Sequence, residues 1–168
     1  MTIAVSKRGN NSTQIQSVIL APSFPLDAKI KNVAANGKKI MFEMKPNGDG
    51  QQTEIKFEAA NSPMEISFDY AEGTDVYLVP PSLVAGAENV GLRVVKAQAR
   101  KDGLFLMLEG RGGKNYELNY KSPQSFKEVE GVKITTSANG EKHLQISFVG
   151  DENLYIRREI LLPFAAVR

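Results

Sequence analysis

The chain carries few side chains of the types that perform common catalytic chemistry. Its 168 residues include one histidine, His143, and no cysteine. Without a thiolate and with a single imidazole, neither a cysteine nucleophile nor the usual zinc site of several His or Cys ligands can be built. The phosphate-binding pattern GxxxxGK[ST], the metalloprotease pattern HExxH and the serine-hydrolase pattern GxSxG are also absent. We therefore expect no metal site, no cofactor and no catalytic residue.

The single histidine lies at the start of a predicted strand over residues 143–149. His143 has the same parity as the polar residues Gln145 and Ser147, whereas the alternate positions of this strand are apolar. Because successive side chains of a strand point to opposite faces, the apolar set is expected to face the core. The pattern therefore predicts an exposed histidine on the polar face of the strand.

Three turns contain residues that bind ions in other proteins. The run GRGG (Gly110–Gly113) lies between two predicted strands, so no helix N-terminus adds its dipole to a phosphate site. We interpret it as a flexible hairpin turn. NGDG (residues 47–50) and GDEN (residues 150–153) offer oxygen ligands for calcium, but neither has the spacing of a complete calcium loop. Both are predicted to be solvated turns.

Paired carboxylates are the remaining route to catalysis, because glycoside hydrolysis uses two acids about 5–9 Å apart. Nothing in their spacing marks a pair among the 19 acidic residues. An enzyme with a paired-carboxylate site is therefore the least favoured interpretation. The acids considered for it are Asp69, Glu72, Asp75, Glu88 and Glu109.

Three aromatic residues are the candidate ligand-binding positions. Tyr77, Phe105 and Tyr155 have the parity opposite to the core residues of their predicted strands. Exposed rings stack on sugars, so these residues would contact a glycan. The same parity would result from packing under a loop or against a neighbouring domain, and the absence of tryptophan argues against a dedicated sugar platform.

The elements that position these residues follow a period of two. In KIMFEMK (residues 39–45) apolar and polar residues alternate, and the preceding Asn36-Gly37 is typical of a two-residue type I′ hairpin turn. LFLML (residues 104–108) is apolar on both faces, as in a strand that is buried on both sides or whose outer face meets another domain. Roughly ten to eleven short strands recur at intervals of about 8–12 residues. The pattern predicts an all-β fold, an antiparallel β-sandwich of the Ig-like or jelly-roll-like kind.

Composition suggests how the chain is divided. Residues 1–14 are predicted to be a linker or disordered segment, because Ser6–Gln14 is rich in Ser, Asn and basic residues. Residues 15–168 are predicted to form the sandwich domain, with a division into two halves considered near 81–91, after Pro80-Pro81.

Charge and hydropathy exclude some partners and locations. The net charge is +2, too small a surplus to grip a phosphate backbone, so we expect no nucleic-acid partner. No run approaches the roughly 20 apolar residues of a membrane span. The first ten residues lack the apolar stretch of a signal peptide, which fits a cytosolic protein or a mature or excised segment.

The order of elements over about residues 18–121 resembles the C-terminal β-sandwich domains of large bacterial glycoside hydrolases, which follow an (α/α)6-barrel catalytic domain. The shared pattern is an apolar strand, an Asn-Gly-Lys hairpin, a Tyr-x-x-Gly, and a GLR strand before an EGxxGxxYxL segment. The tail after Ser122 has no counterpart. The matching positions are Ile30, Val33, Asn36, Gly37, Lys38, Tyr70, Gly73, Leu92, Arg93, Glu109, Gly110, Gly113, Tyr116 and Leu118.

The resemblance implies a non-catalytic module of a bacterial carbohydrate-processing enzyme. Such a module would support or pack against a catalytic domain or another protein partner, carry no catalytic residues, and lie in the periplasm or outside the cell. An independent glycan- or protein-binding module, of the adhesion type, is the alternative from a different functional class.

Overall fold

The computed structural model is all-β, which confirms the predicted fold class. Its described residues form fourteen strands in four antiparallel sheets and contain no helix that could span a membrane. The expected number of strands, roughly ten to eleven, is therefore too low. The described residues are 1–6, 17–47, 50–58, 63–79, 86 and 91–165.

The chain forms two compact units, Met1–Glu72 and Gly73–Arg168, which we call unit 1 and unit 2. Their boundary precedes the junction near 81–91 at which composition suggested a division. Residues 80–85 and 87–90 of that junction lie outside the described residues.

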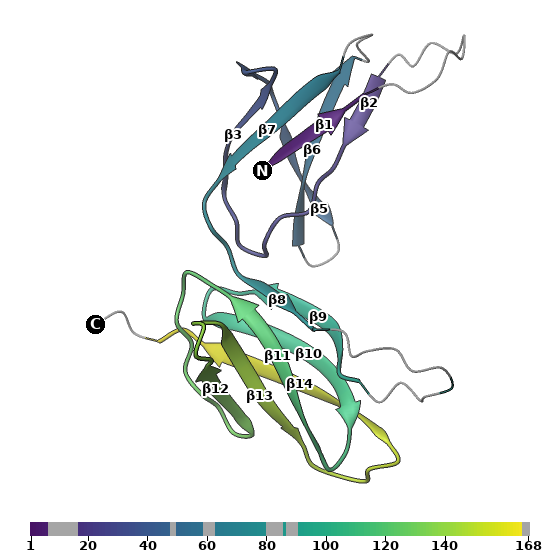
Figure 1. The fold of residues 1–168 in the computed structure, drawn as a ribbon, viewed down its shortest axis with the longest axis vertical. Coiled ribbons are helices and arrows are strands. Elements are labelled where there is room, and N and C mark those ends of the chain that lie inside the picture. Colours follow the sequence, from purple (N-terminus) through teal and green to yellow (C-terminus); the bar gives the residue numbers. More distant parts are fainter. Residues whose placement is uncertain (7–16, 48–49, 59–62, 80–85, 87–90, 166–168) are drawn as a thin grey trace. The chain divides into compact units, whose positions relative to one another are not determined.

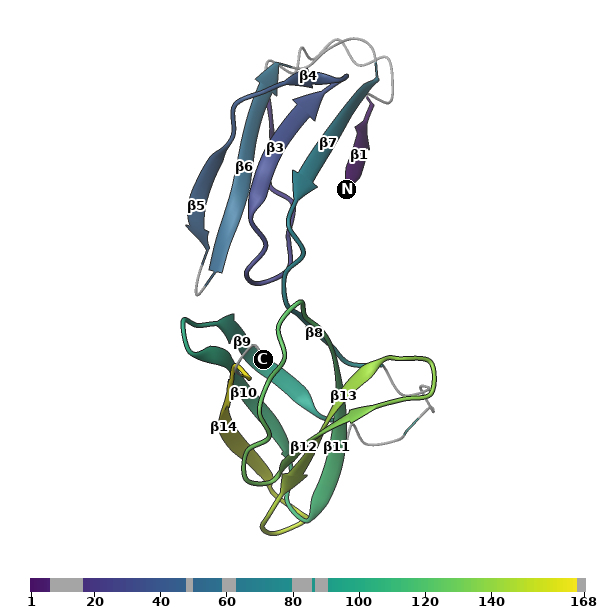
Figure 2. The same cartoon turned by 90° about the vertical axis from the view of Figure 1, so that its left-hand side faces the viewer.

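Unit 1 contains seven strands in two sheets, with the orders β1-β7-β3-β4 and β2-β6-β5 (Figure 1 and Figure 2). A cluster of buried side chains contains Val33, Ile66 and Phe68 of the first sheet and Ile55 of the second. The core of unit 1 therefore lies between its two sheets, in a sandwich-like arrangement. The strands are β1 (Thr2–Val5), β2 (Ser17–Leu20), β3 (Ile30–Ala35), β4 (Lys38–Lys39), β5 (Glu43–Asn47), β6 (Gly50–Glu58) and β7 (Met64–Tyr70).

Strand β1 lies inside the segment 1–14 that composition assigned to a linker, and that assignment is wrong for residues 2–5. Ile3 of β1 lies opposite Ile66 of β7, and the amino group of Met1 donates to the Phe68 carbonyl at 3.0 Å. The apolar side chains of β1 pack against the core of unit 1, which explains why so short a segment is ordered as a strand. Residues 7–14 lie outside the described residues.

The Asn36-Gly37 hairpin is confirmed, but the strand predicted after it is not continuous. Asn36 and Gly37 have φ angles of 46° and 78°, as a type I′ turn requires, and they connect β3 to β4. The run predicted as one strand over 39–45 is divided between β4 and β5, which belong to different sheets (Figure 2). Ile40 and Phe42 pack on the core, whereas Met41 between them is 93% exposed.

Unit 2 also contains seven strands in two sheets, with the orders β14-β10-β9 and β12-β13-β11-β8. Its core takes leucines such as Leu106 from the first sheet and Leu118, Ile146 and Phe148 from the second, again in a sandwich-like arrangement. The strands are β8 (Asp75–Tyr77), β9 (Arg93–Ala99), β10 (Gly103–Arg111), β11 (Lys114–Lys121), β12 (Val132–Thr136), β13 (Lys142–Phe148) and β14 (Tyr155–Pro163).

The glycine-rich run Gly110–Gly113 connects the two sheets of unit 2 and is not a hairpin turn. Strands β10 and β11, which it joins, are members of different sheets. Gly113 has a φ of +68°, and a Cβ on Gly112 would lie 2.4 Å from the Asp151 carbonyl oxygen. Glycine is required here because the chain turns sharply from one sheet to the other against the backbone near residue 151.

Candidate functional site

The outer face of the sheet β12-β13-β11-β8 in unit 2 carries rows of polar side chains. Alternation directs the apolar residues of β11 and β13 into the core, which leaves the intervening residues on the outer face. The strand register then places Asn115 opposite Ser147, and Glu117 opposite Gln145. The positions that make up a third row, across all four strands, are Thr135, His143, Asn119 and Tyr77.

His143 lies in this third row and is only 8% exposed, so the expectation of an exposed histidine is wrong. Its parity is as predicted, because its neighbours Leu144 and Ile146 are in the core. Its Nδ1 atom lies 2.7 Å from Asn119 Oδ1 and 3.2 Å from Glu117 Oε1. Side chains from the adjacent strand therefore surround the imidazole on the outer face.

The contacts of His143 fix the position of one proton. An amide oxygen only accepts hydrogen bonds, so Nδ1 donates to Asn119 Oδ1, and the Glu117 carboxylate is a second acceptor group beside it. The tautomer with hydrogen on Nδ1 is therefore the one that satisfies both partners. Within the described residues, no group of three His, Asp or Glu side chains is arranged to hold a metal ion.

A groove of about 620 Å³, which we call the polar groove, is formed by β11, β12, β13 and the loop before β12. Glu117 lines it and connects it to His143. Glu128 is held in place because its Oε1 accepts a hydrogen bond from the Ile134 amide at 2.8 Å. The polar residues that line the groove are Asn115, Glu117, Glu128, Lys133, Gln145 and Ser147.

The polar groove provides hydrogen-bond donors and acceptors of several kinds on a rigid sheet. Its amides, carboxylates, hydroxyl and ammonium group suit a ligand rich in hydroxyl groups or an extended peptide. Sequence reasoning missed these residues. The signal that could have found them is the alternation of polar residues in NYELN (residues 115–119), VKITT (residues 132–136) and HLQIS (residues 143–147).

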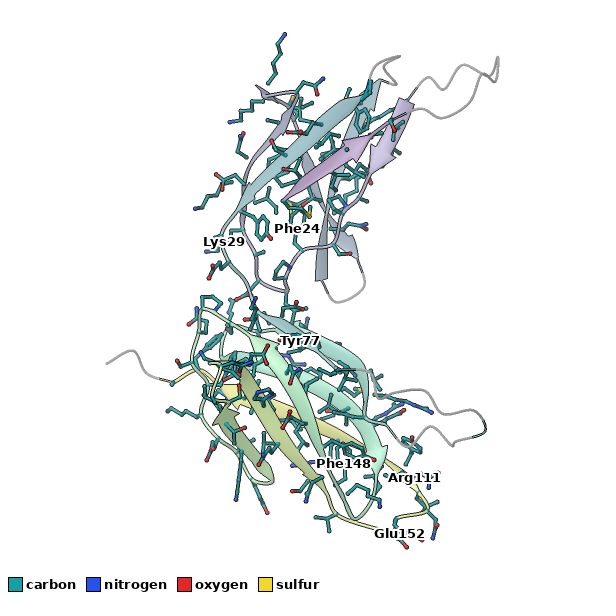
Figure 3. All side chains as sticks on the ribbon, in the orientation of Figure 1. Phe24, Lys29, Tyr77, Arg111, Phe148 and Glu152 are labelled. Carbon is teal, nitrogen blue, oxygen red and sulfur yellow. The ribbon has the colours of Figure 1, made fainter. Side chains whose placement is uncertain are left out.

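The three candidate aromatic residues do not form one site. Tyr77 is on the edge strand β8 of the four-stranded sheet and is 36% exposed (Figure 3). Phe105 and Tyr155 lie on the other sheet of unit 2, on strands β10 and β14. Within unit 2, the aromatic candidates are thus divided between two sheets, and none lines the polar groove.

Phe105 is not an exposed ring, contrary to the expectation for a stacking platform. It is 7% exposed, although it faces away from the leucines of β10 that form the core. The guanidinium carbon of Arg100 lies 3.8 Å from its ring centroid, and Lys96 Nζ lies 5.9 Å from it. The chain's own cations therefore lie against the ring that a sugar would have used.

Tyr155 has a similar environment at the other end of the same sheet. The guanidinium carbons of Arg93 and Arg111 lie 4.7 Å and 5.9 Å from its ring centroid. Its hydroxyl lies 3.4 Å from the Gly91 carbonyl oxygen. The ring is half-buried and serves as a surface against which an arginine packs.

The acids considered for catalysis have other surroundings. Glu109 accepts a hydrogen bond from Arg157 Nε at 3.0 Å. Asp69 belongs to unit 1 and Asp75 to unit 2, and Glu88 lies outside the described residues. Asp151 of the GDEN turn accepts hydrogen bonds from the backbone and the side chain of Asn153. The carboxylates that share a groove are instead Glu117 and Glu128.

No protein-family model, curated protein or solved structure matches this sequence.

Proposed function

We propose that the chain is a non-catalytic β-sandwich module of a bacterial, extracytoplasmic carbohydrate-processing enzyme, where it supports or packs against a catalytic domain. The observation that carries the proposal is that the residues of the resembling pattern have structural tasks. Asn36 and Gly37 form a hairpin turn, and the Asn36 side chain accepts a hydrogen bond from the Glu65 amide at 2.8 Å. A pattern of this kind specifies a scaffold, not a reactive centre.

The second half of the pattern supports the same interpretation. Tyr116 packs edge-to-face against Phe148, with ring centroids 5.5 Å apart, and its hydroxyl accepts a hydrogen bond from the Arg111 amide at 2.9 Å. A Cβ on Gly110 would lie 2.6 Å from the Tyr116 ring. The glycine and the tyrosine of EGxxGxxYxL therefore pack together where β10 leads into β11, which is a structural role.

The reading frame and the stability of a neighbouring domain test this proposal together. We expect the natural gene to encode an (α/α)6-barrel domain before this segment. We also expect that barrel, expressed without the segment, to unfold at a lower temperature than the intact protein. A natural reading frame restricted to these 168 residues would overturn the proposal. So would a barrel whose stability and activity are the same with and without the segment.

Catalysis by the chain itself is tested at the polar groove. We expect no release of reducing ends from a panel of plant and bacterial polysaccharides. Release that is lost in Glu117→Gln and in Glu128→Gln, but kept in Glu65→Gln, would establish the paired-carboxylate enzyme instead. Glu65 is an exposed glutamate of unit 1 and serves as the matched control.

An independent glycan- or protein-binding module is a second candidate, and the polar groove favours it. A glycan array would show ligands for the wild-type chain. Gln145→Ala and Lys133→Ala would then lose binding, and Lys31→Ala in unit 1 would keep it. An array without any ligand would contradict the glycan form of this candidate.

A further inference from the structure

The outer face of the sheet β14-β10-β9 in unit 2 concentrates positive charge. Its cations are Arg93, Lys96, Arg111 and Arg157 on the strands and Arg100 directly after β9, and we call these five residues the cationic face. The carboxylates at outward positions of the same strands are Glu109 and Glu159. Within the described residues of these strands and the position after β9, five cations against two carboxylates give a formal positive surplus larger than the net +2 of the whole chain.

Two of these cations are held in fixed positions by aromatic rings. The guanidinium carbon of Arg100 is 3.8 Å from the centroid of Phe105, and that of Arg93 is 4.7 Å from the centroid of Tyr155. Both arginines are nevertheless exposed. A guanidinium that packs against a ring by one face keeps N–H groups on its edges, so it can still donate two parallel hydrogen bonds to an anion. Because the ring restricts the side chain, less conformational entropy is lost when the anion binds.

The two stacked arginines lie toward opposite ends of the sheet. Phe105 is near the start of β10, and Tyr155 pairs with Arg111 at its end. Six residues of an extended strand separate Phe105 from Arg111, which is roughly 20 Å at about 3.3 Å per residue. A linear polymer with regularly spaced anionic groups could contact both arginines at once, whereas a single small anion could not.

We propose that the cationic face binds an acidic polysaccharide through the carboxylate or sulfate groups of its sugars. The guanidiniums of Arg93 and Arg100 would form the principal contacts, and the register places the Arg157–Glu109 pair in the same cross-strand row as Arg93. Single-stranded nucleic acid fits less well, because its bases bind by stacking on aromatic faces and the Phe105 ring lies under a guanidinium. This site is on the opposite sheet from the polar groove, so it does not depend on the function proposed above.

Binding to polygalacturonate at low ionic strength, measured by affinity electrophoresis and calorimetry, tests the proposal. We expect the wild-type chain to bind polygalacturonate, to release it as the salt concentration is raised, and not to bind the neutral polymer dextran. The double variant Arg93→Gln/Arg100→Gln should bind about tenfold more weakly or worse. The matched control Lys31→Gln/Lys56→Gln removes the same charge from exposed positions of unit 1 and should bind within about twofold of wild type.

Lysine variants separate simple charge from the arginine geometry. Arg93→Lys/Arg100→Lys keeps the charge but loses the planar donor pair, so we expect intermediate affinity. Absence of wild-type binding, equal binding of dextran, or equal losses in the two glutamine double variants would each overturn the proposal. Tighter binding of single-stranded DNA than of polygalacturonate would also overturn it, by assigning the face to nucleic acid. Thermal unfolding of every variant verifies that the fold is retained.

Discussion

Truncation of Leu106 to alanine should destabilise unit 2 strongly. Leu106 is fully buried on β10, the middle strand of its sheet, with Ala97 and Ile160 opposite it on the two neighbouring strands. The substitution removes about three methylene equivalents, or roughly 2.4 kcal/mol of transfer free energy. Strands paired on both sides restrict collapse of the cavity, which raises the expected loss to about 3–5 kcal/mol.

The next residue of the same strand provides the control. Met107 points to the outer face and is partly exposed, so Met107→Ala should cost roughly 1 kcal/mol or less. Urea denaturation gives the two losses of unfolding free energy. Hydrogen exchange at the amides of Leu144 and Ile146 locates the loss, because both residues belong to the facing sheet and to the same core.

The two losses of unfolding free energy show whether the tight packing of β10 is confined to its inner face. Equal destabilisation by Leu106→Ala and Met107→Ala would mean that the outer face of β10 is as tightly packed as the inner face. It would then support the alternative that LFLML is buried on both sides. A loss below about 2 kcal/mol for Leu106→Ala would also contradict a well-packed sandwich core.

Three further substitutions test two separate features of unit 2, a buried tyrosine and the space beside glycines. Burial raises the pKa of Tyr120, so the folded state favours the neutral phenol. The neutral phenol therefore contributes to the unfolding free energy in full below about pH 10, and this contribution is lost as the pH rises through the higher folded-state pKa. Because phenylalanine cannot ionise, Tyr120→Phe should decrease the slope with which the unfolding free energy, measured in urea, falls at alkaline pH. A Cβ on Gly103 would lie 2.1 Å from the Leu162 carbonyl oxygen, so Gly103→Ala should cost about 2–4 kcal/mol in thermal unfolding. In Gly140→Ala the new Cβ meets open space at a φ of +86°, so this variant should cost only about 1 kcal/mol. Equal losses in the two glycine variants would contradict the predicted clash at Gly103. An alkaline slope that is unchanged in Tyr120→Phe would contradict the predicted role of Tyr120.

Local sequence predicts which side of a strand a residue faces, but not what covers it there. The alternation in HLQIS places His143 correctly on the outer face of β13. Its burial depends on Asn119 and Glu117, which the β11–β13 register brings beside it from more than twenty positions away in the chain. Register between strands is a tertiary property that the alternation of a single strand does not contain.

The period-two pattern also does not predict to which sheet a strand belongs. The alternation in KIMFEMK correctly indicates that Ile40 and Phe42 face the core, yet the chain changes sheets between β4 and β5. The run Gly110–Gly113 has the composition of a hairpin turn and instead connects two sheets. In a sandwich, a short turn within a sheet and a short turn between sheets use the same glycine-rich sequences, and packing decides between them.

The surroundings of the candidate aromatic residues likewise depend on contacts between strands. Parity singled out Phe105 and Tyr155, and both lie on the outer face as expected. Their rings are packed against Arg100 and Arg93, which come from β9 and the residue after it, so guanidiniums cover part of each aromatic surface. Alternation placed the two residues on the outer face but did not indicate the cation over each ring, because that cation comes from another strand or from the residue after it.

The two outer faces of unit 2 differ in a way that solubility alone does not require. A soluble surface is obtained by mixing charges of both signs, as the polar groove does with Glu117, Glu128 and Lys133. The cationic face departs from this mixture, and its stacked arginines are exposed in spite of the ordering that their rings impose. Exposed, ordered groups of one charge raise the positive potential over the face, which attracts an anionic ligand that contacts several of them. The salt dependence of polygalacturonate binding is therefore a more informative measurement on this face than the effect of a substitution on stability.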